Sequence, residues 1–272
     1  MGECRTAKPE GPAVITTARQ PLRLPWALAW LRDPLAWAVA GLLLLAAGMP
    51  WLEPVFAALF PALQRPMYRQ DTFLALLGAH AALVAASSAV AIALGVAAGW
   101  WVTRAQGREF RGLVETCVAI GQTVPPVAVL AVAAPLIGFG IWPALIALAM
   151  YGLLPILRGT IAGIELVPPQ VIDAANGMGL NARQRGWQAE WPLALPVLLA
   201  GVRTSVAINI GTAAIAATVG ARTLGSPIII GLAGFNTAYV LQGALVLAAF
   251  AMVTDMGFAR LGRHLQRWRD AA

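Results

Sequence analysis

The stretch VIDAANGMGLNARQRGWQAEWPLALPVLLAG, residues 171–201, is the longest polar interruption in the apolar two thirds of the chain. Its acidic, small and helix-bounding residues are Asp173, Ala174, Ala175, Gly179 and Pro192. Alanine favours helix and has little bulk, so a helix carrying two alanines can lie close against another surface. Gly179 suits the left-handed residue that follows a helix, and Pro192 suits the first turn of the next one. The stretch therefore predicts two short helices, at an angle to one another, against a membrane domain.

Composition indicates that this membrane domain makes up most of the protein. Of the 272 residues, 59% are hydrophobic and 11% are charged, and the mean hydropathy is +0.73. Soluble domains are far less apolar, so we expect an all-α integral membrane protein in contact with lipid. The arginines that raise the pI lie mostly between apolar runs. They form no basic stripe with interleaved aromatic residues, which argues against nucleic-acid binding.

Cysteine and histidine are too sparse for a disulfide framework or a metal centre. Cys4 and Cys117 are the two cysteines, and His80 and His264 are the two histidines. The members of each pair lie far apart in the sequence and lack companion ligands. We therefore expect no bound metal and no cofactor.

Apolar runs predict about six transmembrane helices, since about 20 apolar residues cross a bilayer. Pro125 and Pro126 must break or kink the third span. Gly95 and Gly99, four residues apart, give the second span a face for close helix packing. The predicted spans are residues 34–49, 72–102, 112–139, 141–164, 196–219 and 237–261. Residues 51–60 are interpreted as interfacial, and residues 221–236 as a glycine-rich connection.

Basic residues are unevenly distributed between the two sides that these spans define. With the N-terminus inside, the inner segments hold fifteen Lys and Arg residues, and the outer segments hold three. The positive-inside rule then places both termini and the 171–192 loop in the cytoplasm. The predicted parts are a cytoplasmic tail (1–33), a first span with its outer loop (34–71), the main membrane domain (72–262) and a basic cytoplasmic tail (263–272).

Hydrolysis of ATP by this chain is excluded by its lysine content. A phosphate-binding loop needs lysine between glycine and Ser or Thr. The single lysine, Lys8, follows Ala7. Transport driven by ATP would need an ATPase on another polypeptide, and we expect no catalytic residue in this chain.

The fifth predicted span carries a stripe of small and polar residues. Ser205, Asn209, Thr212 and Ala216 are spaced by four, three and four residues and share one helical face. Ser205, Asn209 and Thr212 are candidates for the wall of a substrate path. The alternative is interhelical hydrogen bonding that holds the bundle together.

A charge inside the same span, Arg203, needs water, a lipid headgroup or an acidic partner. Snorkelling to the inner interface would satisfy it. Glu115 and Asp255 lie near the inner ends of the third and sixth spans, so either could form an ion pair with it.

Taken together, the chain from about 72 to 261 resembles the permease subunits of osmoprotectant ABC importers, the glycine betaine, carnitine and choline group. These belong to the binding-protein-dependent transport inner-membrane components. The matching segments are PALIALAMYGLLPILRGT (143–160), DAANGMGL (173–180), WPLALPVLLAGVRT (191–204) and NIGTAAIAATVGARTLG (209–225). The segment that begins at Asp173 resembles the cytoplasmic "EAA" loop of such permeases. In this chain Asp173 stands where that loop usually has Glu, and Trp191 stands where it usually has Leu.

This resemblance implies a type I ABC importer fold in the bacterial cytoplasmic membrane, with 72–262 as the permease domain. Two permease subunits, identical or different, would meet at the substrate path. Cytoplasmic ATPases would dock on the loop carrying Asp173, Ala174, Ala175, Gly179 and Pro192. An extracytoplasmic binding protein would deliver a compatible solute such as glycine betaine.

Two other classes of protein remain as alternatives. An ion-coupled secondary transporter of small solutes would predict internal symmetry between the two halves, which the sequence lacks. A membrane-embedded enzyme would require clustered His, Cys or acidic residues. Co-purification of an ATPase with the chain would distinguish an ABC permease from both.

Overall fold

A computed structural model describes residues 33–270 of the chain, with side chains as far as 265. The first predicted part, 1–33, lies outside the described residues except for Asp33. The helices from Pro34 onward are α1 Pro34–Gly48, α2 Glu53–Leu59, α3 Phe73–Val102, α4 Arg111–Thr123, α5 Pro126–Ile137, α6 Ile141–Glu165, α7 Pro169–Gly177, α8 Ala182–Arg185, α9 Trp191–Ala213, α10 Gly225–Ala233 and α11 Thr237–Asp270. Short 3₁₀ turns are Met49–Leu52, Arg108–Phe110 and Ile215–Val219, and Gly186–Glu190 is π-helical.

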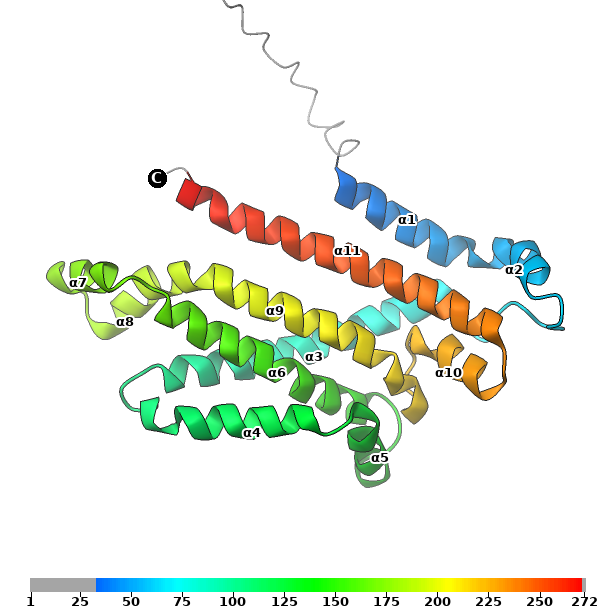
Figure 1. Cartoon of the computed structure of the whole chain (residues 1–272), viewed down its shortest axis with the longest axis horizontal. Helices are drawn as coiled ribbons and strands as arrows, with labels where there is room; N and C mark the ends of the chain where they lie inside the picture. The colour runs from blue at the N-terminus through cyan, green and yellow to red at the C-terminus, as the bar shows by residue number, and fades with distance from the viewer. Residues whose placement is uncertain (1–32, 271–272) are drawn as a thin grey trace, which may run out of the picture. The chain divides into compact units, whose positions relative to one another are not determined.

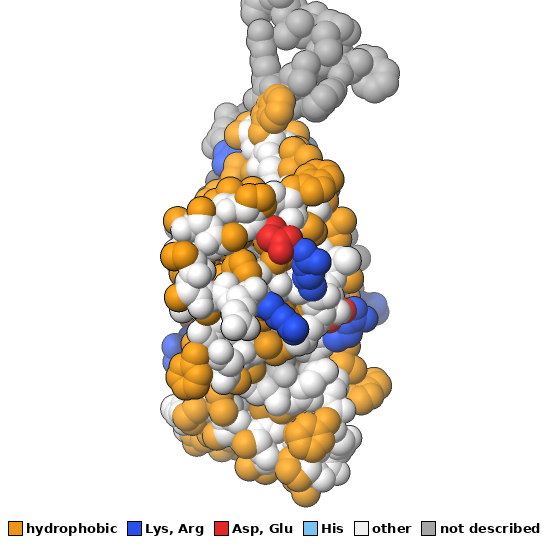
Figure 2. All heavy atoms as spheres, turned by 90° about the vertical axis from the view of Figure 1, so that its right-hand side faces the viewer, with side chains coloured by type: hydrophobic (Ala, Val, Ile, Leu, Met, Phe, Trp, Pro, Cys, Tyr) orange, Lys and Arg blue, Asp and Glu red, His pale blue; other side chains and the backbone are white. Residues whose placement is uncertain are grey.

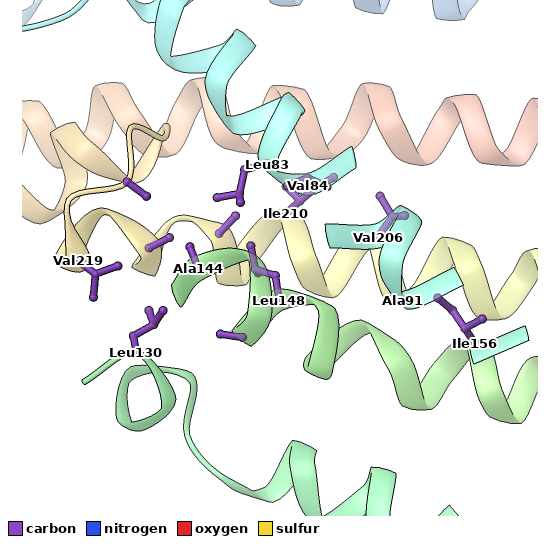
Figure 3. Packing of buried hydrophobic residues seen from close by; sticks show 14 of the residues in the cluster. Leu83, Val84, Ala91, Leu130, Ala144, Leu148, Ile156, Val206, Ile210 and Val219 are labelled. Atoms are coloured by element: carbon purple, nitrogen blue, oxygen red, sulfur yellow. The ribbon is translucent and has the colours of Figure 1, made fainter. Parts of the chain in front are cut away.

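Helices α3, α6 and α9 pack most extensively against one another and form the centre of the bundle (Figure 1). Their shared core consists of aliphatic side chains from all three helices. Figure 3 shows Leu83 of α3, Leu148 of α6 and Ile210 of α9 within this cluster. Among the residues described, five helices are long and apolar enough to cross a membrane, or six if the bent pair α4–α5 counts as one span. The prediction of an all-α membrane protein with about six spans is confirmed.

Glycines allow α3 to approach α6 closely. A Cβ atom built on Gly95 would lie 2.9 Å from Cγ2 of Ile156, and one built on Gly99 would lie 2.7 Å from Cβ of Thr160. Both contacted residues belong to α6. The predicted packing face at Gly95 and Gly99 is confirmed, and such close contacts stabilise helix pairs in lipid through van der Waals attraction.

Helix α11 packs against α1, α9 and α10, and its first half shares a second apolar cluster with residues of α1, α2 and α3. Gln242 of α11 has no exposed surface, and its side chain holds the loop before α3. Its amide nitrogen donates to the carbonyl of Pro66 at 2.6 Å, and its amide oxygen accepts from the N–H of Tyr68 at 3.1 Å. The loop that follows α2 is therefore fixed to the start of α11.

The third predicted span is broken where the sequence places its two prolines. Helix α4 ends at Thr123, α5 begins at Pro126, and the two helices are bent by 89°. Proline lacks an N–H and restricts the preceding residue to extended backbone, so no helix continues through Pro125. The predicted break is confirmed.

Three predicted boundaries differ from the structure. The fifth helix begins at Trp191 instead of 196, because Pro192 occupies its first turn and Pro196 is accommodated within it. The predicted glycine-rich connection 221–236 contains α10, which packs on α11. The sixth helix continues without interruption to Asp270, through the predicted boundary between 262 and 263.

Candidate functional site

Helix α7 and the turn after it hold most of the residues singled out in the 171–192 loop. Ala175 is buried, whereas Asp173, Ala174 and Gly179 are exposed. Gly179 adopts φ +77°, and the N–H of Leu180 donates to the carbonyl of Ala175 at 3.1 Å. This hydrogen bond closes a helix end of the Schellman type, which requires a left-handed residue. The predicted conformation of Gly179 is confirmed.

The chain then enters a second short helix through a reciprocal cap. The backbone N–H of Gln184 donates to the Asn181 side chain at 2.9 Å, and the N–H of Asn181 donates to the Gln184 side chain at 3.0 Å. Both interactions satisfy N–H groups that a helix start leaves unpaired. Pro192 lies in the first turn of α9, as predicted.

A shallow groove of about 420 Å³ lies between α7 and the π-helical segment. It is lined by Gln170, Val171, Ala174, Ala175, Met178, Leu180, Gln188 and Ala189. Met178 is 73% exposed beside it. Among the described residues other than its two chain neighbours, none would lie within 4 Å of a Cβ atom on Gly179. The end of α7 is therefore an open, mainly apolar surface on which another protein has room to pack.

A buried acid beside this loop was missed by the sequence analysis. Glu190 is 4% exposed and accepts hydrogen bonds from Arg104 at 2.5 Å and Arg185 at 3.0 Å. The sequence holds one signal for it, an isolated acid directly before the apolar run that begins at Trp191. Its partner Arg104 lies 86 residues earlier, so the pairing itself could not be read from spacing.

Two of the three residues proposed for a substrate path are buried within the chain. Ser205 and Asn209 have no exposed surface, and Asn209 Nδ2 donates to Ser88 Oγ of α3 at 3.1 Å. Thr212 is partly exposed. For Ser205 and Asn209 this burial favours the alternative interpretation, contact between helices.

Arg203 pairs with one of its two suggested partners. Its Nε and Nη2 atoms donate to the two carboxylate oxygens of Asp255 in α11, at 2.6 and 2.7 Å. The other candidate, Glu115, binds Arg111 of its own helix at 2.8 Å. A bidentate ion pair half exposed on the bundle explains how α9 carries an arginine.

His80 serves as a hydrogen-bonding residue inside the bundle. It has no exposed surface, and its Nδ1 accepts from the N–H of Leu224 at 3.3 Å. Its Nε2 lies 3.1 Å from the carbonyl of Ile210, in the last turn of α9. Among the residues that the structure describes, no three His, Cys, Asp or Glu side chains are grouped as metal ligands.

The arrangement of spans is shared with permeases of known structure. A chain of the MetNI methionine ABC transporter, in an inward-facing conformation, superposes with a TM-score of 0.63 over 73% of this chain and 100% of that one, at 22% identity. A chain of an amino acid ABC transporter crystallised with histidines gives a TM-score of 0.56 over 71% of this chain and 92% of that one, at 15% identity. These likenesses define the class: the fold is that of a type I ABC importer permease.

Residues 91–267 match the family described as binding-protein-dependent transport system inner membrane component, and the chain belongs to this family. The osmoprotectant import permease protein OsmY of Salmonella typhimurium is 40% identical over 72% of this chain and 84% of its own length. The choline transport system permease protein OpuBB of Bacillus subtilis is 37% identical over 65% and 83%. The glycine betaine/carnitine/choline permease protein OpuCB of Bacillus subtilis is 39% identical over 61% and 74%.

Family membership decides between the classes left open by the sequence. The chain is an inner-membrane permease, the membrane-spanning component of a binding-protein-dependent transport system. It is not an ion-coupled secondary transporter, and ATP hydrolysis is the task of a partner.

Proposed function

We propose that this permease imports a quaternary ammonium osmoprotectant such as glycine betaine, choline or carnitine. The observation that carries the proposal is the similarity, at 37 to 40% identity, to one permease named for osmoprotectants and two named for choline or for glycine betaine, carnitine and choline. All three solutes carry a cationic nitrogen with no N–H to donate. The same chemical feature would unite the substrates of this chain.

The ATPase docks, in this proposal, on the exposed end of α7. The groove beside Ala174 and Ala175, the exposed Met178 and the open space at Gly179 support this assignment. Asp173 lies on the exposed side of the same helix, and Pro192 sets the start of α9. The end of α7 offers apolar contacts and an open backbone turn at Gly179. Such a surface suits a partner protein that transmits force to this helix, because the contact needs no deep pocket.

Both termini and the α7 loop face the cytoplasm in the proposed orientation. The opposite end, which carries α2 and α10, shows few charged side chains among hydrophobic ones (Figure 2). There, Arg69 pairs with Glu53 at 2.5 Å and Arg222 pairs with Asp71. The low number of arginines at this end suits the outer side, because the positive-inside rule counts Lys and Arg. A cysteine in place of Asn181, in a variant without Cys4 and Cys117, should be labelled only from the cytoplasmic side of sealed vesicles.

A second permease subunit, identical or different, completes the path along the exposed face of α9. Thr204, Ala207 and Gly211 lie on this face, opposite the buried Ser205 and Asn209. Small residues allow another helix to approach closely in lipid. Thr212 borders the same face and is the member of the predicted stripe that we retain for the path.

Selection of the solute rests mainly with the binding protein. Aromatic faces usually hold quaternary ammonium groups, with about 0.5 to 2 kcal/mol per contact. In this chain the guanidinium of Arg104 already lies 3.9 Å from the centre of the Trp100 ring. A path of small residues without a free aromatic cage suits a conduit that releases what it admits.

Uptake by cells that express the complete importer tests this proposal. Glycine betaine, choline and carnitine should be taken up only with ATP and the binding protein present, and exchanging the binding protein should change the preferred solute. Uptake of methionine in place of all three solutes would overturn the substrate assignment and leave the permease class intact.

A further inference from the structure

The carboxylate of Glu190 joins three parts of the chain that meet at the inner end of the bundle. It lies at the end of the π-helical segment Gly186–Glu190, directly before α9. Arg104 Nη2 donates to one of its oxygens at 2.5 Å, and Arg185 Nε donates to the other at 3.0 Å. The Glu190 side chain is 5% exposed, so both ion pairs are shielded from solvent.

Each arginine comes from a different element. Arg104 follows the end of α3 at Val102, whereas Arg185 is the last residue of α8. The Nη1 atom of Arg185 also donates to Asn176 Oδ1 in α7 at 2.9 Å. Glu190 lies directly before α9 and binds both arginines. Arg185 links it to α8 and α7, and Arg104 links it to the end of α3.

Aromatic packing reinforces this connection. The Trp100 ring of α3 lies 5.9 Å from Trp191 and 6.1 Å from Trp187, between ring centres. A Cβ atom on Gly186 would come within 2.8 Å of the Trp100 ring. The π-helical segment thus packs closely against the Trp100 ring of α3 at Gly186. Segments of π-helix are rare and occur often at functional sites.

We propose that Glu190 is a positioning residue for ATP coupling, and that it fastens the ATPase-docking loop to α3 and α9 so that both spans move with the loop. This inference rests on the proposed docking of the ATPase at α7. A buried acid held by two arginines resists separation, because removal of one partner leaves an unpaired buried charge. A movement applied at α7 is therefore transmitted to two central helices at once, without relying on the backbone of the π-helical segment alone.

Glu190→Gln keeps the size of the side chain and removes its charge. The matched control is Glu165→Gln, at the end of α6, because Glu165 also binds an arginine, Arg111, but is half exposed and lies before α7. Arg104→Gln is a second test from the other side of the same contact, and it leaves the pair of Arg185 and Glu190 in place. The full-length chain is purified with its ATPase and reconstituted in liposomes.

The first readout is ATP hydrolysis with and without the binding protein loaded with glycine betaine. The second is the distance between spin labels on cysteines replacing Gln106 and Arg183, two exposed positions after α3 and within α8. We expect Glu190→Gln and Arg104→Gln to lower the stimulation of hydrolysis about tenfold, equivalent to about 1.4 kcal/mol of coupling. Trapping with ATP and vanadate should leave the label distance unchanged in the native chain and broaden it in both variants.

If the stimulation of ATP hydrolysis and the label distance are unchanged in both variants, at normal amounts of complex, the role of Glu190 is overturned. The proposed function is not affected by that result. Absence of stimulation in the native complex would instead overturn the proposed function. A loss of stimulation in Glu165→Gln equal to that in Glu190→Gln would show that any inner ion pair matters, which also contradicts a specific role.

Discussion

Two faces of α9 both carry small and polar residues, yet they meet different surroundings. On one face, Gly201 and Asn209 pack against α6 and α3. On the other, Ala207 and Gly211 are exposed, and a Cβ atom on Gly211 would have no neighbour within 4 Å from the described residues outside its own stretch of helix. Small residues therefore serve two purposes on one helix. They allow close packing within the chain on the first face, and on the second they leave room for the partner that we propose there.

The packed face depends on backbone proximity more than on hydrogen bonds. A Cβ atom on Gly201 would lie 3.2 Å from Cα of Gly159 in α6. By contrast, Ser205 Oγ and Asn209 Oδ1 have no hydrogen-bond partner among the residues described. The largest effects are thus expected from added volume, and smaller ones from lost polar contacts.

Gly201→Leu should have the largest effect on the packed face. The added side chain would overlap the backbone of α6, and overpacking of this kind costs about 1–3 kcal/mol or more. We expect little folded protein after extraction into detergent, measured by monodispersity and thermal unfolding. The same substitution at Gly211, ten residues along the same helix, is the control for helix propensity and side-chain size. Equal folded yields for the two variants would contradict the assignment of faces.

Gly211→Leu should leave folding unchanged and impair transport. Its side chain would project from the exposed face into the proposed contact with the second permease subunit, so we expect uptake to fall by about tenfold, or about 1.4 kcal/mol. Uptake and crosslinking between permease subunits are measured at equal amounts of protein. Gly41→Leu in α1 is the matched control, because a Cβ atom there also meets nothing within 4 Å. Normal uptake by Gly211→Leu would remove this face from the path.

Asn209→Leu should have the smallest effect. It removes the hydrogen bond to Ser88, and such bonds between membrane helices are worth about 0.6 to 1.7 kcal/mol. We expect a small loss of thermal stability and somewhat slower uptake, with the order of preference among betaine, choline and carnitine retained. A changed preference in this variant would mean that Asn209 reaches the substrate after all.

Local features of the structure could be predicted from the sequence, and long-range ones could not. Three local features follow from the backbone limits or the small size of single residues. They are the left-handed Gly179, the break at Pro125 and Pro126, and the packing face at Gly95 and Gly99. The sequence could not predict which face of α9 packs inside the bundle, because both faces carry small and polar residues. Only the positions of α3 and α6 distinguish the two faces.

The same limit applies to charged and short elements. Glu190 and Arg104 are brought together by tertiary packing across 86 residues, and the pairing of Glu190 with the nearby Arg185 does not signal this second contact. Helix α10 is nine residues long in a glycine-rich region, and its packing on α11 outweighs its weak helix propensity. For Arg203, by contrast, the cost of an isolated charge in a span suggested two candidate acids besides snorkelling, and one of the two, Asp255, is its partner.

The central claim is that the α7 end couples the ATPase to the membrane domain. Its most direct test compares the native complex with the Gly179→Asp complex, and the quantity measured is the stimulation of ATP hydrolysis by loaded binding protein. The left-handed backbone at Gly179 tolerates Asp or Asn better than other side chains, and the site is open within this chain. The chain should therefore fold and assemble with its ATPase. We expect Gly179→Asp to abolish the stimulation, because a charge would be buried in the packed interface. Gly179→Asn, of equal size and without charge, should retain part of it. Normal stimulation in the assembled Gly179→Asp complex would contradict the account.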